Sequence, residues 1–236
     1  MKRIVLFTLF AGLATAAQAQ QTEFSVQATS GYFGYRGESA TNTSQLILSD
    51  VAQIPHYTNN PYGNRFTLSY GGAGQVQRVT AGGLLMGVQA GYEWLRSRVN
   101  IDRLYGDIPS GDAASGHAIL TNSSIQAHGF IGWRFRVRQM ELDATLGPEV
   151  GFRQHLREKA EATNGTSRYT TDTERYASGT PDVRARLNLT AYYHRFGVAV
   201  GYSHGLSNYR AGFVGGTNDL YSRMLRLGLV CRLVKS

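Results

Sequence analysis

Apolar and polar positions alternate along much of this chain, most clearly over residues 84–99. Large apolar side chains occupy the even positions from Leu84 to Trp94, whereas small or polar residues such as Gln89 and Glu93 lie between them. Successive side chains of a β-strand point to opposite faces, so a period of two predicts a strand with one apolar face. Soluble sandwiches contain such strands too, but here the pattern recurs about eight times.

Each of the eight alternating segments is predicted to be one strand of an antiparallel, up-and-down sheet. Long polar connections alternate strictly with short turns between them. Outer-membrane barrels alternate in this way, so the order predicts an all-β, eight-stranded transmembrane β-barrel with both termini on the periplasmic side. The strands are expected at residues 24–32, 65–79, 84–99, 125–135, 142–152, 183–193, 196–202 and 221–233, and the long loops at about 36–64, 103–123, 154–181 and 205–219.

Two local signals refine this outline. Pro148 lacks a backbone N–H, so a bulge is expected in the strand that contains it. Asn164-Gly165 is a typical two-residue turn, which predicts a tight hairpin inside the third long segment that extends well above the membrane.

The parity of the apolar positions is kept when strands are paired across the predicted turns. A two-residue turn at 138–139 makes residues whose numbers sum to 277 face each other. Two opposite-charge pairs then fall on the face to be enclosed, where cross-strand pairs of this kind stabilise a sheet. The predicted pairs are Arg134–Asp143 and Arg136–Glu141 inside, Phe135–Leu142, Trp133–Ala144 and Ile131–Leu146 outside, and, across a second turn at 194–195, Tyr193–Phe196, Ala191–Val198 and Leu189–Val200.

Aromatic residues gather at the two ends of the predicted strands. Membrane barrels carry such girdles at both lipid–water interfaces, whereas a soluble barrel has no reason to sort its aromatics by height. The outer girdle is expected to contain Tyr32, Phe66, Tyr92, Trp94, Phe152, Tyr202 and Tyr221, and the periplasmic girdle Phe24, Trp133, Phe135, Tyr193 and Phe196.

The first residues have the layout of a secretory signal peptide. Residues 1–3 are basic at Lys2 and Arg3, residues 4–16 are apolar, and Ala17-Gln18-Ala19 fits a small-x-small cleavage site. The apolar run is too short to span a bilayer as a helix, and no later run of about 18 apolar residues follows. We therefore expect a signal peptide at 1–19, a barrel domain at 20–236, and secretion through the inner membrane to the outer membrane.

Composition narrows the class of partner. With 28 Gly, 5 Pro and 14 Tyr, and a mildly polar mean hydropathy, the chain is unlike a helical membrane protein. Removal of Lys2 and Arg3 leaves 22 basic and 16 acidic residues, a net charge of +6. The arginines are dispersed over strand faces, which favours anionic lipid headgroups or internal ion pairs over nucleic acid. The lone Cys231 excludes an intramolecular disulfide, and we expect no cofactor.

This chain resembles the small outer-membrane barrels of Gram-negative bacteria, the OmpX and OmpA-type families. The resemblance lies in the signal peptide and in eight alternating, Gly-rich strands. The stretch over residues 60–99, NPYGNRFTLSYGGAGQVQRVTAGGLLMGVQAGYEWLRSRV, is similar to the central hairpin of outer-membrane β-barrel domain proteins. The resemblance covers essentially the whole chain after the signal peptide. Such barrels often end on an aromatic residue read by the barrel-assembly machinery, whereas this chain ends RLVKS.

Charged residues at inward positions are the first candidates for function. An eight-stranded barrel has an interior only wide enough for side chains, so charges there must pair. We expect a structural ion-pair network that fills the lumen; the alternative is a narrow ion channel. The predicted network contains Glu93, Arg134, Arg136, Glu141, Asp143, Glu149, Arg184, Arg186, Arg226 and Arg232.

A lipid-modifying enzyme is a second alternative. Outer-membrane lipid A deacylases carry a His-x-Ser-Asn element, and His204, Ser207 and Asn208 resemble it with one extra residue. One extra residue in a strand turns Ser207 to the opposite face from His204, and no acid has the parity of a third member. We therefore expect no catalytic residue. Four of the other histidines, His56, His117, His128 and His155, lack ligand spacing, so no metal site is expected.

The loops are the third candidate, because function often lies on loops carried by a rigid scaffold. Loop one holds an apolar patch from Leu46 to Ile54 that is expected to fold over the barrel mouth, and loop three is charged and carries Tyr169 and Tyr176. We expect a monomeric, non-enzymatic barrel with a structural or adhesive role exercised through these loops. Its expected partners are outer-membrane lipids and lipopolysaccharide, the assembly machinery during biogenesis, and an unidentified loop ligand.

Overall fold

The computed structural model describes residues 21–50, 54–106, 111–165, 167–176, 180–212 and 218–235. The expected signal peptide and Val51 lie outside these residues. In the described part of the chain no helix is long and apolar enough to cross a membrane. The strands are β1 (Gln21–Arg36), β2 (Thr43–Ile47), β3 (Tyr57–Thr58), β4 (Arg65–Val79), β5 (Leu84–Tyr105), β6 (Asp112–Val137), β7 (Met140–Asn164), β8 (Ser167–Glu174), β9 (Asp182–Tyr193), β10 (Phe196–Gly205) and β11 (Tyr221–Lys235).

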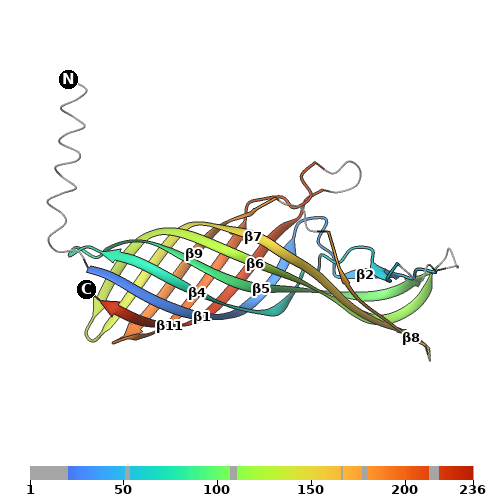
Figure 1. Ribbon diagram of the computed structural model, residues 1–236, viewed down its shortest axis with the longest axis horizontal. Helices are drawn as coiled ribbons and strands as arrows, with labels where there is room; N and C mark the ends of the chain where they lie inside the picture. The colour runs from blue at the N-terminus through green and yellow to red at the C-terminus, as the bar shows by residue number, and fades with distance from the viewer. Residues whose placement is uncertain are drawn as a thin grey trace, which may run out of the picture.

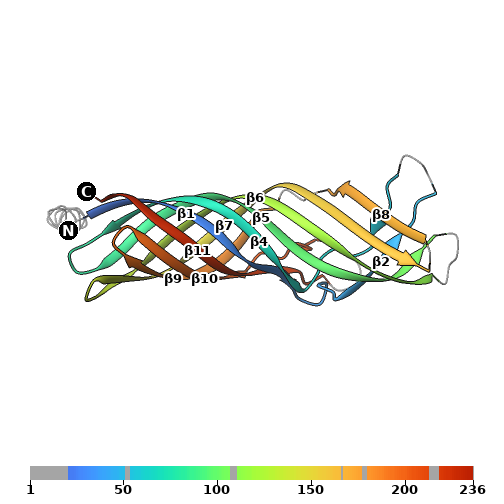
Figure 2. The same cartoon turned by 90° about the horizontal axis from the view of Figure 1, so that it is seen from below.

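Eight of these strands form a closed antiparallel ring (Figure 1). The order is β1, β4, β5, β6, β7, β9, β10 and β11. The ring closes because β11 pairs with β1 over most of the length of both strands. Both termini of the described chain and the short turns lie at one end, and β2 and β8 lie at the other (Figures 1 and 2). The predicted eight-stranded up-and-down barrel is confirmed.

The two predicted hairpin turns have the predicted registers. Every pair expected across residues 138–139 and 194–195 is present in the sheet. The first turn residue is in the left-handed region in both cases, with φ 56° at Arg138 and 55° at His194. Turns of this hand match the twist of the flanking strands, which explains how non-glycine residues are held in that conformation.

Two expected loops are wrong over most of their length. β5 continues to Tyr105, β6 begins at Asp112 and β7 runs to Asn164, so residues 103–123 and 154–181 are largely strand. The predicted tight hairpin is confirmed, but its turn begins one residue later than predicted: Asn164 still pairs with Ser167, and Gly165, whose φ is 58°, is the first turn residue. The prolonged strands project beyond the barrel as a sheet that also contains β2 and β8 (Figure 2).

The bulge expected at Pro148 is also wrong. His128 pairs with Glu149 and Ile131 pairs with Leu146, so the register between β6 and β7 is the same on both sides of the proline. The neighbouring pairs hold the strands in place although Pro148 has no N–H to donate. The register shift between β6 and β7 lies further from the short turns, between Ser123 and Ser124, where these strands leave the barrel.

The outward face of the ring is apolar and exposed, and the girdle residues lie on it. Val88, Ile131 and Leu229, for example, expose 62%, 67% and 68% of their surface. Side chains of this size at such exposure need a non-aqueous surrounding. The predicted girdle residues Tyr32, Phe66, Trp94, Trp133, Phe135, Phe152, Tyr193, Phe196 and Tyr202 are exposed, and Tyr92 and Tyr221 are half-buried.

Candidate functional site

The end of the lumen near the short turns holds one group of buried ion pairs. The guanidinium of Arg134 donates from Nη1 to Glu23 at 2.7 Å and from Nε to Asp143 at 2.6 Å. Arg232 lies 3.3 Å from Glu23, and its Nη1 donates to Glu141. Four strands of the ring contribute these side chains, so the group ties opposite walls of the barrel together.

A second group of ion pairs lies further from the short turns, around the fully buried carboxylate of Glu149. Its oxygens accept hydrogen bonds from Arg184 at 2.8 Å, Arg186 at 2.9 Å and Arg226 at 3.0 Å. Glu93 accepts two further bonds from Arg226, both of 3.0 Å. Asp182 accepts one from Arg184 at 2.6 Å and one from Ser222, so three carboxylates face three guanidinium groups.

Nine of the ten predicted lumen residues therefore lie in the two groups. Arg136 is the exception: its side chain is 58% exposed at the mouth, 3.9 Å from Glu141. The prediction missed Glu23 and Asp182, which both join the network. Glu23 has the inward parity of β1 and could have been found from it. Asp182 lies at the very start of β9, beyond the alternation that marked the strand.

The lumen between the two groups is filled by amide side chains. Gln77 donates to Glu23 at 2.7 Å, and Gln89 donates to Gln27 at 2.7 Å. Two cavities of only about 10 Å³ each lie beside these residues. A void of that size holds about one water molecule.

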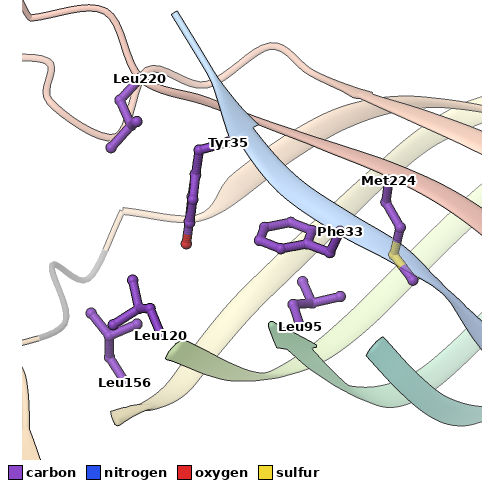
Figure 3. Close-up of a cluster of buried hydrophobic side chains, with 7 residues drawn as sticks. All are labelled: Phe33, Tyr35, Leu95, Leu120, Leu156, Leu220 and Met224. Carbon is purple, nitrogen blue, oxygen red and sulfur yellow. The ribbon is translucent and has the colours of Figure 1, made fainter. Parts of the chain in front are cut away.

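An apolar cluster lies beyond the second group, toward the long loops (Figure 3). Tyr35 stands at its centre, and the rings of Tyr62 and Tyr209 meet it edge-on at centroid distances of 5.2 and 5.5 Å. Tyr62 and Tyr209 come from the first and last long loops, so these loops close the barrel mouth. The buried members are Phe33, Tyr35, Leu95, Leu120, Leu156, Leu220 and Met224.

The projecting sheet has a second apolar core, covered by loop one. β2 pairs in parallel with the end of β5, and Leu46 is fully buried on the inner face of the sheet. Tyr62 of loop one thus packs at the barrel mouth, as expected, but the apolar patch of the loop packs on the projection instead, and Ile54 of that patch is 52% exposed. The core consists of Leu46, Val99, Ile101, Leu104, Ala118, Ala160 and Ala162.

Polar contacts fasten loop one across the sheet. The backbone N–H of Thr58 donates 2.7 Å to the buried carboxylate of Glu158, which also binds Arg175 at 2.5 Å. The hydroxyl of Thr171 donates 2.5 Å to the carbonyl of His56. β3 is thereby joined to β7 and β8 through side chains, and the projection becomes a small folded unit.

The outer face of the projecting sheet is covered by exposed ion pairs. Asp172 accepts from Arg157 at 2.6 Å and lies 3.4 Å from Lys159, and Glu161 accepts from Arg168 at 2.7 Å. The hydrogen bond from Arg157 holds the pKa of Asp172 below its usual value. A face of this composition is suited to water, in contrast to the apolar wall of the ring below it.

Three features together define the architecture: a closed ring, an exposed apolar wall and an ion-paired interior. The fold is that of a small outer-membrane β-barrel. Apolar groups can face outward only where lipid replaces water, and backbone groups can avoid water only where the sheet closes.

Two solved structures align with most of this chain at low sequence identity. The crystal structure of Neisserial surface protein A aligns over 89% of this chain and 97% of that chain, with a TM-score of 0.36 and 12% identity. The structure of Ail, the attachment invasion locus protein of Yersinia pestis, in complex with the heparin analogue sucrose octasulfate, aligns over 92% and 100%, with a TM-score of 0.33 and 11% identity. The sequence matches no protein-family model and no curated protein.

The barrel holds His204 and Ser207 with different partners. The Nδ1 atom of His204 lies 3.1 Å from the hydroxyl of Tyr202, and the Ser207 hydroxyl accepts from the N–H of Val183 at 2.9 Å. Asn208 hydrogen-bonds within the last long loop. The described residues contain no group of three His, Cys, Asp or Glu that could hold a metal ion.

Proposed function

We propose that this chain is an integral outer-membrane protein whose barrel is a closed support for an extracellular interaction surface. The observation that carries the proposal is the contrast between the two ends. One end has only short turns, whereas the other carries a projecting sheet with its own core and a loop fastened over it. A purely structural barrel has no need of a second folded unit outside the bilayer.

The proposed contact surface lies where loop one meets β8. The guanidinium of Arg175 lies 5.6 Å from the ring centroid of Tyr57, and Tyr176 beside it is 92% exposed. Exposed tyrosines next to arginine have the composition of binding hot spots, since both side chains combine a large contact area with hydrogen-bonding capacity.

Location and topology are tested together in intact cells. A single cysteine introduced by Tyr176→Cys in a Cys231→Ser background should react with a membrane-impermeant maleimide on whole cells. The same cysteine placed at the opposite end, by Arg138→Cys, should react only after the envelope is opened. Labelling of Arg138→Cys in intact cells, or fractionation of the protein away from the outer membrane, would contradict the proposal.

An adhesive role is tested by removing the exposed rings. Cells that display Tyr57→Ala/Tyr176→Ala should lose retention on protein-coated surfaces and cell–cell aggregation, at equal surface abundance. Leu206→Ala is the matched control, because Leu206 is also exposed, at 58%, on another loop at the same end. Equal loss in both variants would refute a specific role for the tyrosines.

The closed lumen argues against the channel alternative. The two ion-paired groups, the amides and the apolar cluster follow one another along the bore, and the two cavities beside the amides have room for about one water molecule each. Purified protein in planar bilayers should therefore show no steady single-channel steps. Stable conductance steps would overturn the proposal of a support with a filled lumen.

A further inference from the structure

A belt of arginines covers one side of the barrel just above the outer aromatic girdle. On β1 the outward face passes from Tyr32 through Gly34 to Arg36, and on β5 it passes from Trp94 to Arg96 and Arg98. The belt consists of Arg36, Arg65, Arg96, Arg98 and Arg223, carried by the neighbouring strands β11, β1, β4 and β5. Its height is where lipid headgroups meet the wall of a membrane barrel.

These arginines have no carboxylate partner. None of the five lies within 4 Å of an acidic side chain of the described residues, whereas the arginines of the filled lumen and several on the outer sheet do. Arg65 and Arg98 are directly opposite each other on β4 and β5. Like charges in that position repel, so an anion between or over them would stabilise the pair.

Two members of the belt are held in fixed positions with donors to spare. Arg223 lies 4.5 Å from the ring centroid of Phe66 and donates 3.0 Å to the carbonyl of Asn64. It reaches them across Gly34, its partner on β1, which has no side chain to block the way. Arg36 lies 4.7 Å from the ring centroid of Tyr221 and donates 2.8 Å to a backbone carbonyl.

The remaining donors of these two guanidinium groups point to a ligand. The Nε atoms of Arg36 and Arg223 have no hydrogen-bond partner among the described residues, and because both are buried, a ligand would contact these guanidinium groups through their terminal nitrogens. Stacking on a ring and one bond to the backbone orient a guanidinium without neutralising it. A planar fork held in this way matches the oxygens of a phosphate group.

An apolar groove lies below the belt on the same side of the barrel. It has a volume of about 360 Å³ and is lined on β1, β10 and β11 by small and aliphatic residues, among them Ala28, Ser30, Val198, Leu227 and Leu229. The small side chains of Ala28 and Ser30 on β1 lie next to the larger ones of Leu227 and Leu229 on the neighbouring strand β11, and this step in size hollows the wall. A groove of this kind suits an acyl chain that hangs from a headgroup at the belt.

We propose that the belt and the groove form a binding site for one lipid A molecule, whose phosphates contact the arginines and one of whose acyl chains lies in the groove. This inference rests on the proposed outer-membrane location. A phosphorylated sugar lipid fits better than a single-phosphate glycerolipid, because the five cations extend over four strands and therefore suit more than one phosphate.

The test measures lipid retained by the purified, refolded protein. Wild type, Arg36→Gln/Arg223→Gln, Arg65→Gln/Arg98→Gln and the control Arg157→Gln/Lys159→Gln are reconstituted with bisphosphorylated lipid A, dephosphorylated lipid A or phosphatidylglycerol. Native mass spectrometry then counts bound lipid, and heat-modifiable gel mobility confirms that each barrel is folded. The control also removes two positive charges, but from the outer sheet, where Arg157 and Lys159 face Asp172.

Wild type and control should retain bisphosphorylated lipid A about tenfold better than either belt variant, and better than the other two lipids. Equal retention by a folded belt variant, or by wild type with dephosphorylated lipid A, would overturn the site. Equal retention of phosphatidylglycerol would overturn its assignment to lipid A. Because binding is measured in vitro, these outcomes are separate from the labelling of cells that tests the outer-membrane location.

Discussion

Replacing Glu149 with glutamine tests whether paired charges hold the lumen together. The side chain is fully buried and accepts bonds from Arg184, Arg186 and Arg226. Glutamine keeps the shape but removes the charge, so three guanidinium groups would face only two carboxylates, Glu93 and Asp182.

The size of the effect follows from which arginine loses most. Arg226 keeps both bonds to Glu93, and Arg184 keeps Asp182, but Arg186 retains only the amide oxygen of Asn188 at 2.9 Å. Breaking a buried pair by removing one partner costs about 3–5 kcal/mol because the other charge stays buried. We expect Glu149→Gln to lower the free energy of unfolding by about that amount.

The assay is reversible unfolding in lipid vesicles, followed by tryptophan fluorescence. Both tryptophans, Trp94 and Trp133, face outward, so their emission reports loss of the lipid contact. The double variant Glu149→Gln/Arg186→Gln removes the charge left unpaired and should recover part of the loss. Wild-type stability in Glu149→Gln, or a double variant no more stable than the single one, would refute the reasoning.

Three further outcomes follow from particular contacts. Gly197→Val should destabilise the barrel, since a Cβ at Gly197 would lie 2.7 Å from the ring of the inward Tyr192; chemical denaturation measures the loss. Arg138→Asn should raise the free energy of unfolding by about 0.5 kcal/mol, because asparagine tolerates the left-handed backbone that Arg138 adopts; unchanged stability would contradict this. The pKa of Asp172 is lowered by Arg157, so their ion pair is intact above the ordinary pKa of the carboxyl and is lost as pH falls through the lowered one; NMR titration should show this pKa return upward in Arg157→Gln.

The parts of the fold that touch lipid were predictable from the sequence. Strand β4 begins and ends where alternation predicts, at Arg65 and Val79, and the pairs Arg134–Asp143 and Arg136–Glu141 follow from one assumed turn. In the bilayer an outward polar residue or an unpaired inward charge is costly, so nearly every position obeys the pattern. A short turn then determines the register of the whole hairpin.

The projecting sheet was not predictable by the same rule. The outward parity of β7 changes near Gln154, because Ser123 pairs with His155 and Ser124 pairs with Arg153. A pattern that is read continuously along the strand breaks at this point, and the residues beyond it resemble a polar loop. The partners that fasten loop one, Thr58 with Glu158, are 100 residues apart in the chain and share no local signal.

The wall of the molecule reverses its polarity where it leaves the bilayer, and this reversal locates the membrane surface. On β5 the inward side chain is Glu93 below the boundary and Leu95 and Val99 above it, whereas the outward one is Trp94 below and Arg98 above. In lipid there is no hydrophobic gain from an apolar interior, so the lumen can be ionic as long as its charges are paired. In water the gain returns, and the sheet buries its apolar side under loop one. The arginine belt lies at this transition, where an anionic headgroup layer would meet the barrel.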